Sequence, residues 1–129
     1  DTKYQLDKIP ELGALISERS NIPIARNKPV LGHGNFIRES GIGINFVMND
    51  PLVMFGTHPS LTGKVGEVVL GKKSGKASII YKMGELGMGA LEDEKIGLIL
   101  DEVKSTGIAK RDVLTNEEFT NIVAAVMSK

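Results

Sequence analysis

The last third of the chain carries the clearest hydrophobic pattern. Apolar residues recur there at intervals of three and four positions, which is the spacing of one face of an α-helix. They form three groups: Ile79, Ile80, Met83 and Leu86; Ile96, Ile99, Leu100 and Val103; and Phe119, Ile122, Val123, Val126 and Met127. We therefore expect three amphipathic helices that pack together at the C-terminal end of the chain.

Capping residues mark the expected boundaries of these helices. Thr115 and Glu118 have the spacing of a capping box at the start of the third helix. Ser74 is placed to cap the first helix and Gly87 to end it. The second helix is expected to end near Gly107. These residues predict where each helix begins or ends.

The first two thirds of the chain are less regular. Residues 9–19 have helical periodicity, the pattern of residues 36–48 is ambiguous, and residues 65–70 form a short β-branched run typical of a buried strand. Nine of the 15 glycines lie between Gly32 and Gly75, so loops are expected to dominate this part. The whole pattern predicts a mostly helical α+β fold with a loop-rich middle.

Composition and charge narrow the possible functions. The 16 basic and 16 acidic residues balance, so the basic excess typical of a nucleic-acid-binding protein is missing. No apolar run approaches the roughly 20 residues of a membrane-spanning helix, and the sequence has no cysteine. We expect a cytoplasmic protein with neither a nucleic-acid nor a membrane partner. His33 and His58 lie 25 positions apart, and we predict no metal ligand in this chain.

One segment concentrates positive charge. From Lys64 to Lys82 there are five lysines and a single acid, Glu67. Within this segment the sequence GKKSGK, residues 71–76, places lysines and glycines just before a predicted helix, where free amide groups and the helix dipole favour an anion. The pattern is equally typical of an anion site and of a capped helix with solvated lysines.

Two further places offer polar chemistry. His33 lies between two glycines in GHGNF, where a ligand could approach the backbone closely, although a single loop histidine is more often solvated. Arg38, Glu39 and Ser40 could supply an anion clamp and a carboxylate, but such triplets are also common on helix surfaces. His58, in THPS, indicates a turn.

Three stretches, in this order along the chain, resemble one enzyme family. PELGALISERSNIPIARNKPVLG resembles the segment that follows the catalytic barrel in isopropylmalate and homocitrate synthases. NFIRESGIGIN is similar to their AFxHESGIHQDG stretch, and VVLGKKSGKASIIYKMGELG is similar to their LGKHSGRxAxxxxLxELG signature. The third motif is the most specific, and the resemblance covers nearly all of the 129 residues.

This resemblance implies a metal-dependent condensation of acetyl-CoA with a 2-oxo acid. The TIM barrel that binds the divalent metal and the 2-oxo acid would precede Asp1. Residues 1–70 and 71–129 would be two post-barrel sub-domains that dimerise and cover the active site, and the chain alone would be inactive. The side chains expected to contact the substrate or the acyl-CoA are His33, Arg38, Glu39, Ser40, Lys72, Lys73, Ser74 and Lys76.

The chain departs from the family at positions associated with catalysis. Arg38 replaces the histidine of HESG, and Gly43 replaces the histidine associated with acid–base work across the dimer. Met54 corresponds to the position of a family tyrosine. A general base needs a titratable side chain within hydrogen-bond reach, so the catalytic residues stay unassigned. The alternative is therefore a dimerisation or assembly module that has lost the chemistry.

Overall fold

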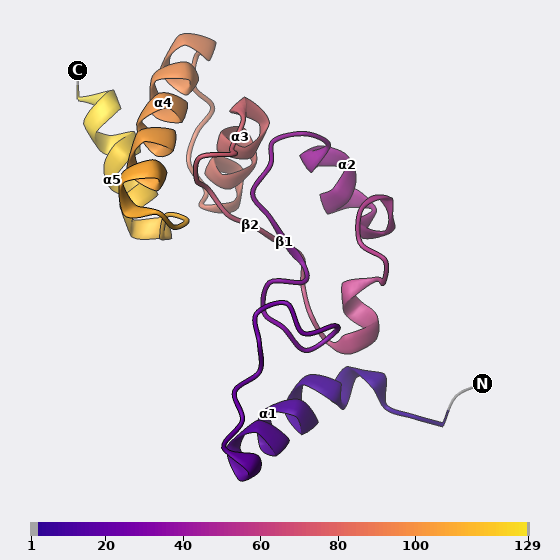
Figure 1. The fold of residues 1–129 in the computed structure, drawn as a ribbon. Helices are drawn as coiled ribbons and strands as arrows, with labels where there is room; N and C mark the ends of the chain where they lie inside the picture. Colours follow the sequence, from indigo (N-terminus) through magenta and orange to yellow (C-terminus); the bar gives the residue numbers. More distant parts are fainter. Residues whose placement is uncertain (1–2, 129) are drawn as a thin grey trace. The chain divides into compact units, whose positions relative to one another are not determined.

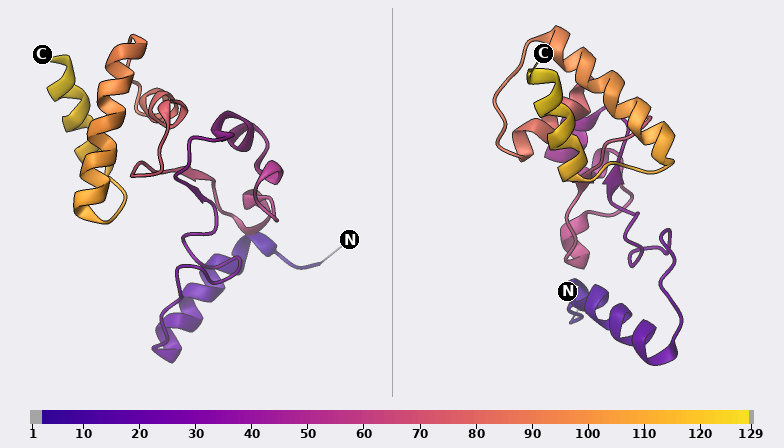
Figure 2. Two further views of the ribbon diagram at one scale, coloured as in Figure 1. Left: turned by 45° about the horizontal axis from the view of Figure 1, so that its top comes forward. Right: turned by 90° about the vertical axis from the view of Figure 1, so that its left-hand side faces the viewer.

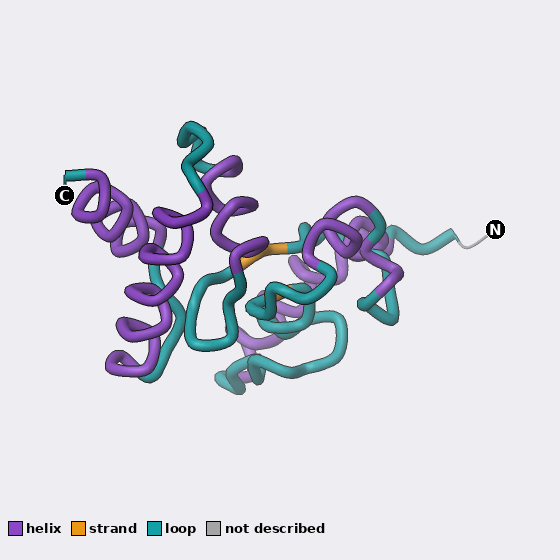
Figure 3. The backbone as a smooth tube through the Cα atoms, turned by 90° about the horizontal axis from the view of Figure 1, so that it is seen from above, coloured by secondary structure: helices purple, strands orange, loops and turns teal. Residues whose placement is uncertain are grey.

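The computed structural model describes residues 3–128 (Figure 1). In chain order, their elements are the 3₁₀ turn η1 (Leu6–Lys8), helix α1 (Ile9–Ser20), strand β1 (Ile37–Arg38), helix α2 (Ile44–Asn49), the 3₁₀ turns η2 (Pro51–Val53) and η3 (Pro59–Thr62), strand β2 (Glu67–Val68), and helices α3 (Lys76–Glu85), α4 (Asp93–Lys110) and α5 (Asn116–Met127). Figure 3 shows how small the strand content is beside the helices. The predicted mostly helical α+β fold is confirmed.

The chain forms two compact units. Unit 1 holds the residues up to 37 together with 46–67, and unit 2 holds 38–45 together with the residues from 68 onwards. These units are defined by compactness within this chain. The boundary at residue 70 that the family resemblance implies stays a prediction.

Unit 2 contains the predicted three-helix arrangement. Helices α4 and α5 lie side by side, and α3 packs against α4 (Figures 1 and 2). An antiparallel bridge, in which the Leu114 amide donates to the Leu70 carbonyl at 2.8 Å, joins the segment before α5 to the end of the β2 segment. The buried cluster between these elements consists of Leu70, Ile79, Met83, Ile96, Ile99, Val103, Leu114, Phe119 and Val123.

The capping box at the start of α5 is confirmed. The Glu118 amide donates to Thr115 Oγ1 at 3.2 Å, and the Thr115 amide donates to Glu118 Oε2 at 2.7 Å. Lys110 Nζ also lies 2.8 Å from Glu118 Oε2. These hydrogen bonds, led by the one from Lys110, lower the pKa of Glu118 from its usual 4.5.

The prediction that Ser74 caps the first of these helices is wrong, and the second helix ends three residues beyond Gly107. Helix α3 begins at Lys76, with Gly75 as its N-cap residue, because Ser74 is used in the preceding turn. Helix α4 continues through Gly107 to Lys110 and ends at Arg111, which has a left-handed φ of 59°. The predicted role of Gly87 is confirmed, since it follows α3 with a φ of 68°.

The ambiguous stretch of residues 36–48 contains both kinds of structure. Its first part forms β1, and its last part forms α2 after Gly43, whose φ is 69°. The amides of Glu67 and Val69 donate to the carbonyls of Phe36 and Arg38, so β1 and β2 run in the same direction. Strand β2 is shorter than the predicted run of residues 65–70, although residues 68–70 are buried as expected.

Unit 1 is held by a few specific contacts. The rings of Phe36 and Phe55 meet edge to face with centroids 5.5 Å apart. Lys64 Nζ donates to the carbonyl oxygens of Leu31 at 2.7 Å and Gly32 at 3.0 Å, which ties the loop after α1 to the segment before β2. Polar contacts to the backbone thus supply part of the cohesion of this unit.

Apolar side chains are buried very unequally in the two units. Over the described residues, unit 2 buries twelve apolar residues and leaves five large ones exposed, whereas unit 1 buries only Phe36 and Val47. The exposed ones in unit 1 number twelve: Tyr4, Leu6, Leu12, Leu15, Ile16, Ile22, Phe46, Leu52, Val53, Met54, Leu61 and Val65. Helix α1 has the predicted amphipathic periodicity, but its apolar stripe faces solvent in this chain.

The α5 capping box generates a stability prediction. Thr115→Ala removes the hydroxyl acceptor of the Glu118 amide and should lower the free energy of unfolding by about 1 kcal/mol, measured by urea denaturation. Thr120→Ala is the control, because this exposed hydroxyl only bonds back to the Asn116 carbonyl within the helix. Equal losses for the two variants would contradict the capping role of Thr115. The cap is local, so oligomeric state should not change.

Candidate functional site

The GKKSGK motif folds into a tight turn that we call the lysine turn, residues 71–75. The Ser74 amide donates to the Gly71 carbonyl at 3.1 Å, and the Gly71 amide donates to Ser74 Oγ at 2.9 Å. Gly71 and Ser74 are buried, whereas Lys72 and Lys73 are exposed. The turn therefore holds two adjacent lysines at the surface on a closed backbone loop.

Glu39 fastens the lysine turn from another part of the chain. Its Oε1 accepts the Lys73 amide at 3.0 Å, and its carbonyl oxygen accepts the Ser74 hydroxyl at 3.4 Å. A carboxylate that bonds a backbone amide makes a charge-assisted hydrogen bond, which is stronger than a neutral one. The glutamate that the sequence offered as a substrate contact is thus engaged within the protein.

Glycines allow three segments to meet at this turn. A Cβ on Gly41 would lie 2.8 Å from both Cα and N of Gly75, closer than real Cβ atoms come. A Cβ on Gly107, within α4, would lie 3.0 Å from Gly71 Cα and 3.1 Å from Lys72 N. Backbone therefore packs directly on backbone on both sides of the lysine turn.

Lys76 differs from the other two lysines of the motif. It lies at the first position of α3, and its Nζ contacts Asp93 Oδ2, at the start of α4, at 2.5 Å. The Asp93 carboxylate offsets the positive charge of Lys76. Lys72 and Lys73, in contrast, are exposed and form no salt bridge with the described residues of the chain.

Arg38 and Ser40 shape the segment next to Glu39. Arg38 Nη2 donates to the Ile42 carbonyl at 2.7 Å, and Ser40 Oγ accepts the Ile42 amide at 3.3 Å. Arg38 Nε is buried and has no hydrogen-bond partner among the described residues. Both side chains therefore stabilise the loop that leads from β1 to α2.

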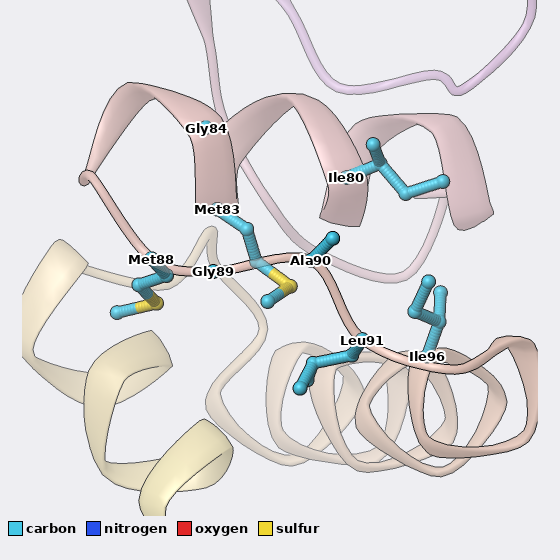
Figure 4. A pocket seen from close by; sticks show the side chains of 8 residues that line it. All are labelled: Ile80, Met83, Gly84, Met88, Gly89, Ala90, Leu91 and Ile96. Atoms are coloured by element: carbon cyan, nitrogen blue, oxygen red, sulfur yellow. The ribbon is translucent and has the colours of Figure 1, made fainter.

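Sequence reasoning missed two features of α3. An open apolar pocket of about 310 Å³ lies beside its second half, and Figure 4 shows Met83 of α3, Leu91 of the loop that follows and Ile96 of α4 among the side chains that line it. Lys82 is buried and pairs with Glu85 at 2.8 Å. Burial, together with the Glu85 charge, raises the pKa of Tyr81 above 10.0. A lysine next to the apolar positions Ile79 and Met83 was the available signal for this pair.

Residues 3–128 contain neither a cluster of metal-ligating side chains nor a membrane-spanning helix. No three His, Asp or Glu side chains gather there in a way that could hold a metal ion. No helix in that range is long and apolar enough to cross a membrane.

Comparisons with known proteins agree with the sequence motifs. The chain is 34% identical over 119 residues to a probable 2-isopropylmalate synthase of Ignicoccus hospitalis, which is 92% of this chain and 29% of that protein. It is 32% identical over all 129 residues to the homocitrate synthase AksA of Methanocaldococcus jannaschii, or 31% of that protein. A (R)-citramalate synthase CimA of the same organism is 28% identical over 107 residues, which is 83% of this chain and 22% of that protein. No model of a protein family matches the sequence.

By sequence, the chain is homologous to a part of the isopropylmalate and homocitrate synthases. The family resemblance of the motifs is thereby confirmed. The chain spans only about a third of the length of the relatives it matches.

The positions that the resemblance assigns to the family's histidine and tyrosine have no titratable side chain here. Gly43 has a left-handed φ of 69°, which a histidine would adopt only with strain, and Met54 is exposed. His33 is exposed and belongs to unit 1, whereas Arg38, Glu39, Ser40 and the motif lysines belong to unit 2. The structure thus brings Glu39 and Ser74 into contact, and the predicted ligand contacts of these residues stay predictions.

His58 has the turn role that its sequence context predicts. Its Nδ1 accepts the Ser60 amide at 3.3 Å at the start of η3. This prediction is confirmed.

Two glycines of α4 form a matched test of the packing at the lysine turn. Gly107→Ala should lower the free energy of unfolding by about 1–2 kcal/mol, because the new methyl group meets the backbone of residues 71 and 72. Gly97→Ala should raise it by up to about 1 kcal/mol, because its Cβ meets nothing within 4 Å and alanine favours the helix. Chemical denaturation of both variants measures the difference, and a stabilising Gly107→Ala would contradict the close approach.

Proposed function

We propose that this chain is the post-barrel, C-terminal part of an enzyme that condenses acetyl-CoA with a 2-oxo acid. In this proposal the chain dimerises, covers the barrel active site and contacts the anionic part of the acyl-CoA. The divalent metal and the 2-oxo acid belong to the barrel of the longer protein. The relatives, named as isopropylmalate, homocitrate and citramalate synthases and matched over most of this chain, support the proposal.

The exposed apolar surface of unit 1 supports a role in docking. Twelve large apolar side chains are exposed there against two buried apolar residues, a balance that is unusual for a unit that stands alone. On α1, Leu12, Leu15 and Ile16 form an exposed stripe at helical spacing. A second copy of the chain covers this stripe in the proposed dimer, and the barrel covers other parts of unit 1.

The lysine turn is the single observation that carries the ligand role. It displays Lys72 and Lys73 from a backbone fixed by Glu39 and Ser74, within the motif most specific to the family. Two lysine ammonium groups on a rigid support are suited to the phosphates of coenzyme A. In this role the chain orients the acyl-CoA for a reaction that takes place in the barrel.

In this proposal the chain's own residues bind and position the acyl-CoA. No candidate proton-transfer group occupies positions 43 and 54, where the family resemblance would place one. Gly43 and Met54 cannot accept or donate a proton. Proton transfer in the proposed enzyme therefore falls to residues outside this chain.

The glycine at position 43 also favours a second candidate function. A module that dimerises and supports assembly without taking part in the reaction needs no acid–base group, and the left-handed φ of Gly43 suits glycine rather than histidine. The lysine turn distinguishes the two functions, since an assembly module has no need to bind coenzyme A.

Removal of the two exposed lysines tests the ligand role. In the enzyme that carries this chain together with its barrel, Lys72→Ala with Lys73→Ala should raise KM for the acyl-CoA about tenfold, because two exposed ionic contacts contribute about 0.5–1 kcal/mol each. KM for the 2-oxo acid should stay within twofold. The effect should shrink as salt is added.

The control for this experiment is Lys76→Ala, whose charge is already paired with Asp93. It should change KM for the acyl-CoA less than the double variant does. An unchanged KM in the double variant would mean that these lysines are a solvated face, and would favour the assembly module.

Self-association of the 129-residue chain tests the docking role. Sedimentation at high micromolar concentration should show association that is lost in Leu12→Glu with Leu15→Glu, because these charges would be buried unpaired in an interface. Leu98→Glu, on an equally exposed position of α4, is the control and should associate like the wild type. A clean monomer for the wild-type chain would argue against this role of α1.

A further inference from the structure

The backbone of the lysine turn has little capacity left to bind an anion. The Gly71 amide donates to Ser74 Oγ, the Lys73 amide to Glu39 Oε1, the Ser74 amide to the Gly71 carbonyl, and the Gly75 amide to Ser78 Oγ at 3.3 Å. The remaining nitrogen of the turn, that of Lys72, would lie 3.1 Å from a Cβ on Gly107 of α4, so little space is left beside it. A phosphate that approaches residues 71–75 therefore meets mainly lysine side chains rather than free amides of this turn.

We propose that Glu39 is a positioning residue for this turn: it binds no ligand itself, and its carboxylate fixes where Lys72 and Lys73 stand. This inference rests on the proposed function, in which the two lysines contact the acyl-CoA. The observation behind it is a contact between residues 34 positions apart, the 3.0 Å hydrogen bond from the Lys73 amide to Glu39 Oε1.

The carboxylate is placed so that it supports the turn over more than one residue. A Cβ on Gly71 would lie 2.7 Å from Glu39 Oε1, so the carboxylate sits directly against the backbone of residue 71 as well as bonding residue 73. The Glu39 carbonyl accepts the Ser74 hydroxyl, and Ser74 Oγ in turn accepts the Gly71 amide. Glu39 thus contacts the beginning, the middle and the end of the turn.

The charge of Glu39 has a second consequence. A carboxylate next to the two lysines offsets part of their positive potential. It therefore weakens their attraction for the anion that they are proposed to bind. Glutamine keeps an oxygen that accepts the Lys73 amide and removes the negative charge. A comparison of Glu39→Gln with Glu39→Ala therefore separates the effect of the position of the lysines from the effect of the local charge.

The test compares these variants in the enzyme that carries this chain with its barrel. Glu39→Ala should speed hydrogen exchange of the Lys73 amide at least tenfold and raise KM for acetyl-CoA on the order of tenfold, with KM for the 2-oxo acid within twofold. Glu39→Gln should keep Lys73 exchange within threefold of the wild type and leave KM for acetyl-CoA equal or up to about threefold lower. Glu94→Gln, an exposed glutamate of α4, is the charge-matched control and should change neither.

The outcomes separate this inference from the proposed function. Unchanged Lys73 exchange in Glu39→Ala would overturn the positioning role. Faster Lys73 exchange in Glu39→Ala with an unchanged KM for acetyl-CoA would also overturn it, provided that the double variant Lys72→Ala with Lys73→Ala does raise this KM. If the double lysine variant leaves KM unchanged, the ligand role fails and this inference fails with it. If Glu39→Ala does not fold, Glu39→Gln decides: a KM for acetyl-CoA at or below that of the wild type supports the inference, and a rise of threefold or more overturns it.

Discussion

Direct packing of backbone on backbone determines the geometry of the lysine turn. A Cβ on Gly41 would lie 2.8 Å from the backbone of Gly75, and a Cβ on Gly107 of α4 would lie 3.0 Å from Gly71 Cα, so that the backbone there would have to shift. A segment packed in this way cannot shift without disturbing α4 or the loop before α2. The turn is therefore rigid although both of its central side chains are long, charged and exposed. The hydrogen bond from Lys73 to Glu39 and the internal bonds of Ser74 complete this support.

The two units satisfy the demand for apolar burial in different ways. Unit 2 buries a cluster shared by three helices and the segments that lead into them, so its fold is supported from within. Unit 1 relies on an aromatic pair, on Lys64 bonded to two carbonyls, and on the few apolar residues it buries. Leucine and isoleucine side chains are exposed along α1. Such side chains, when they are not buried within one chain, are typical of a surface that becomes buried in an interface. This difference is the physical basis for assigning docking to unit 1 and ligand contact to unit 2.

The proposed division of labour follows from the side chains that are present. The chain displays positive charge at the lysine turn but has glycine and methionine at the positions that the resemblance assigns to titratable groups of the family. Fixed charge can orient an anionic ligand without taking part in bond making, because ionic attraction requires no proton transfer. A post-barrel part that only binds the acyl-CoA and covers the active site would therefore not need a histidine at position 43 or a tyrosine at position 54. The barrel would then have to supply the groups that transfer protons.

Local interactions are what the sequence by itself determined. The α5 capping box, the αL residue Gly87 and the helical stripes of α3, α4 and α5 involve residues three to eight positions apart, and each was predicted. The family motifs likewise lie within short stretches. Tertiary structure decided the rest: Gly107 is a contact with the lysine turn rather than a helix end, Ser74 closes that turn rather than capping α3, and Glu39 holds it from 34 residues away. A pattern along the chain reflects interactions between residues that are close in sequence. These three roles instead depend on segments that are far apart in sequence and come into contact only where the backbone packs closely at glycine.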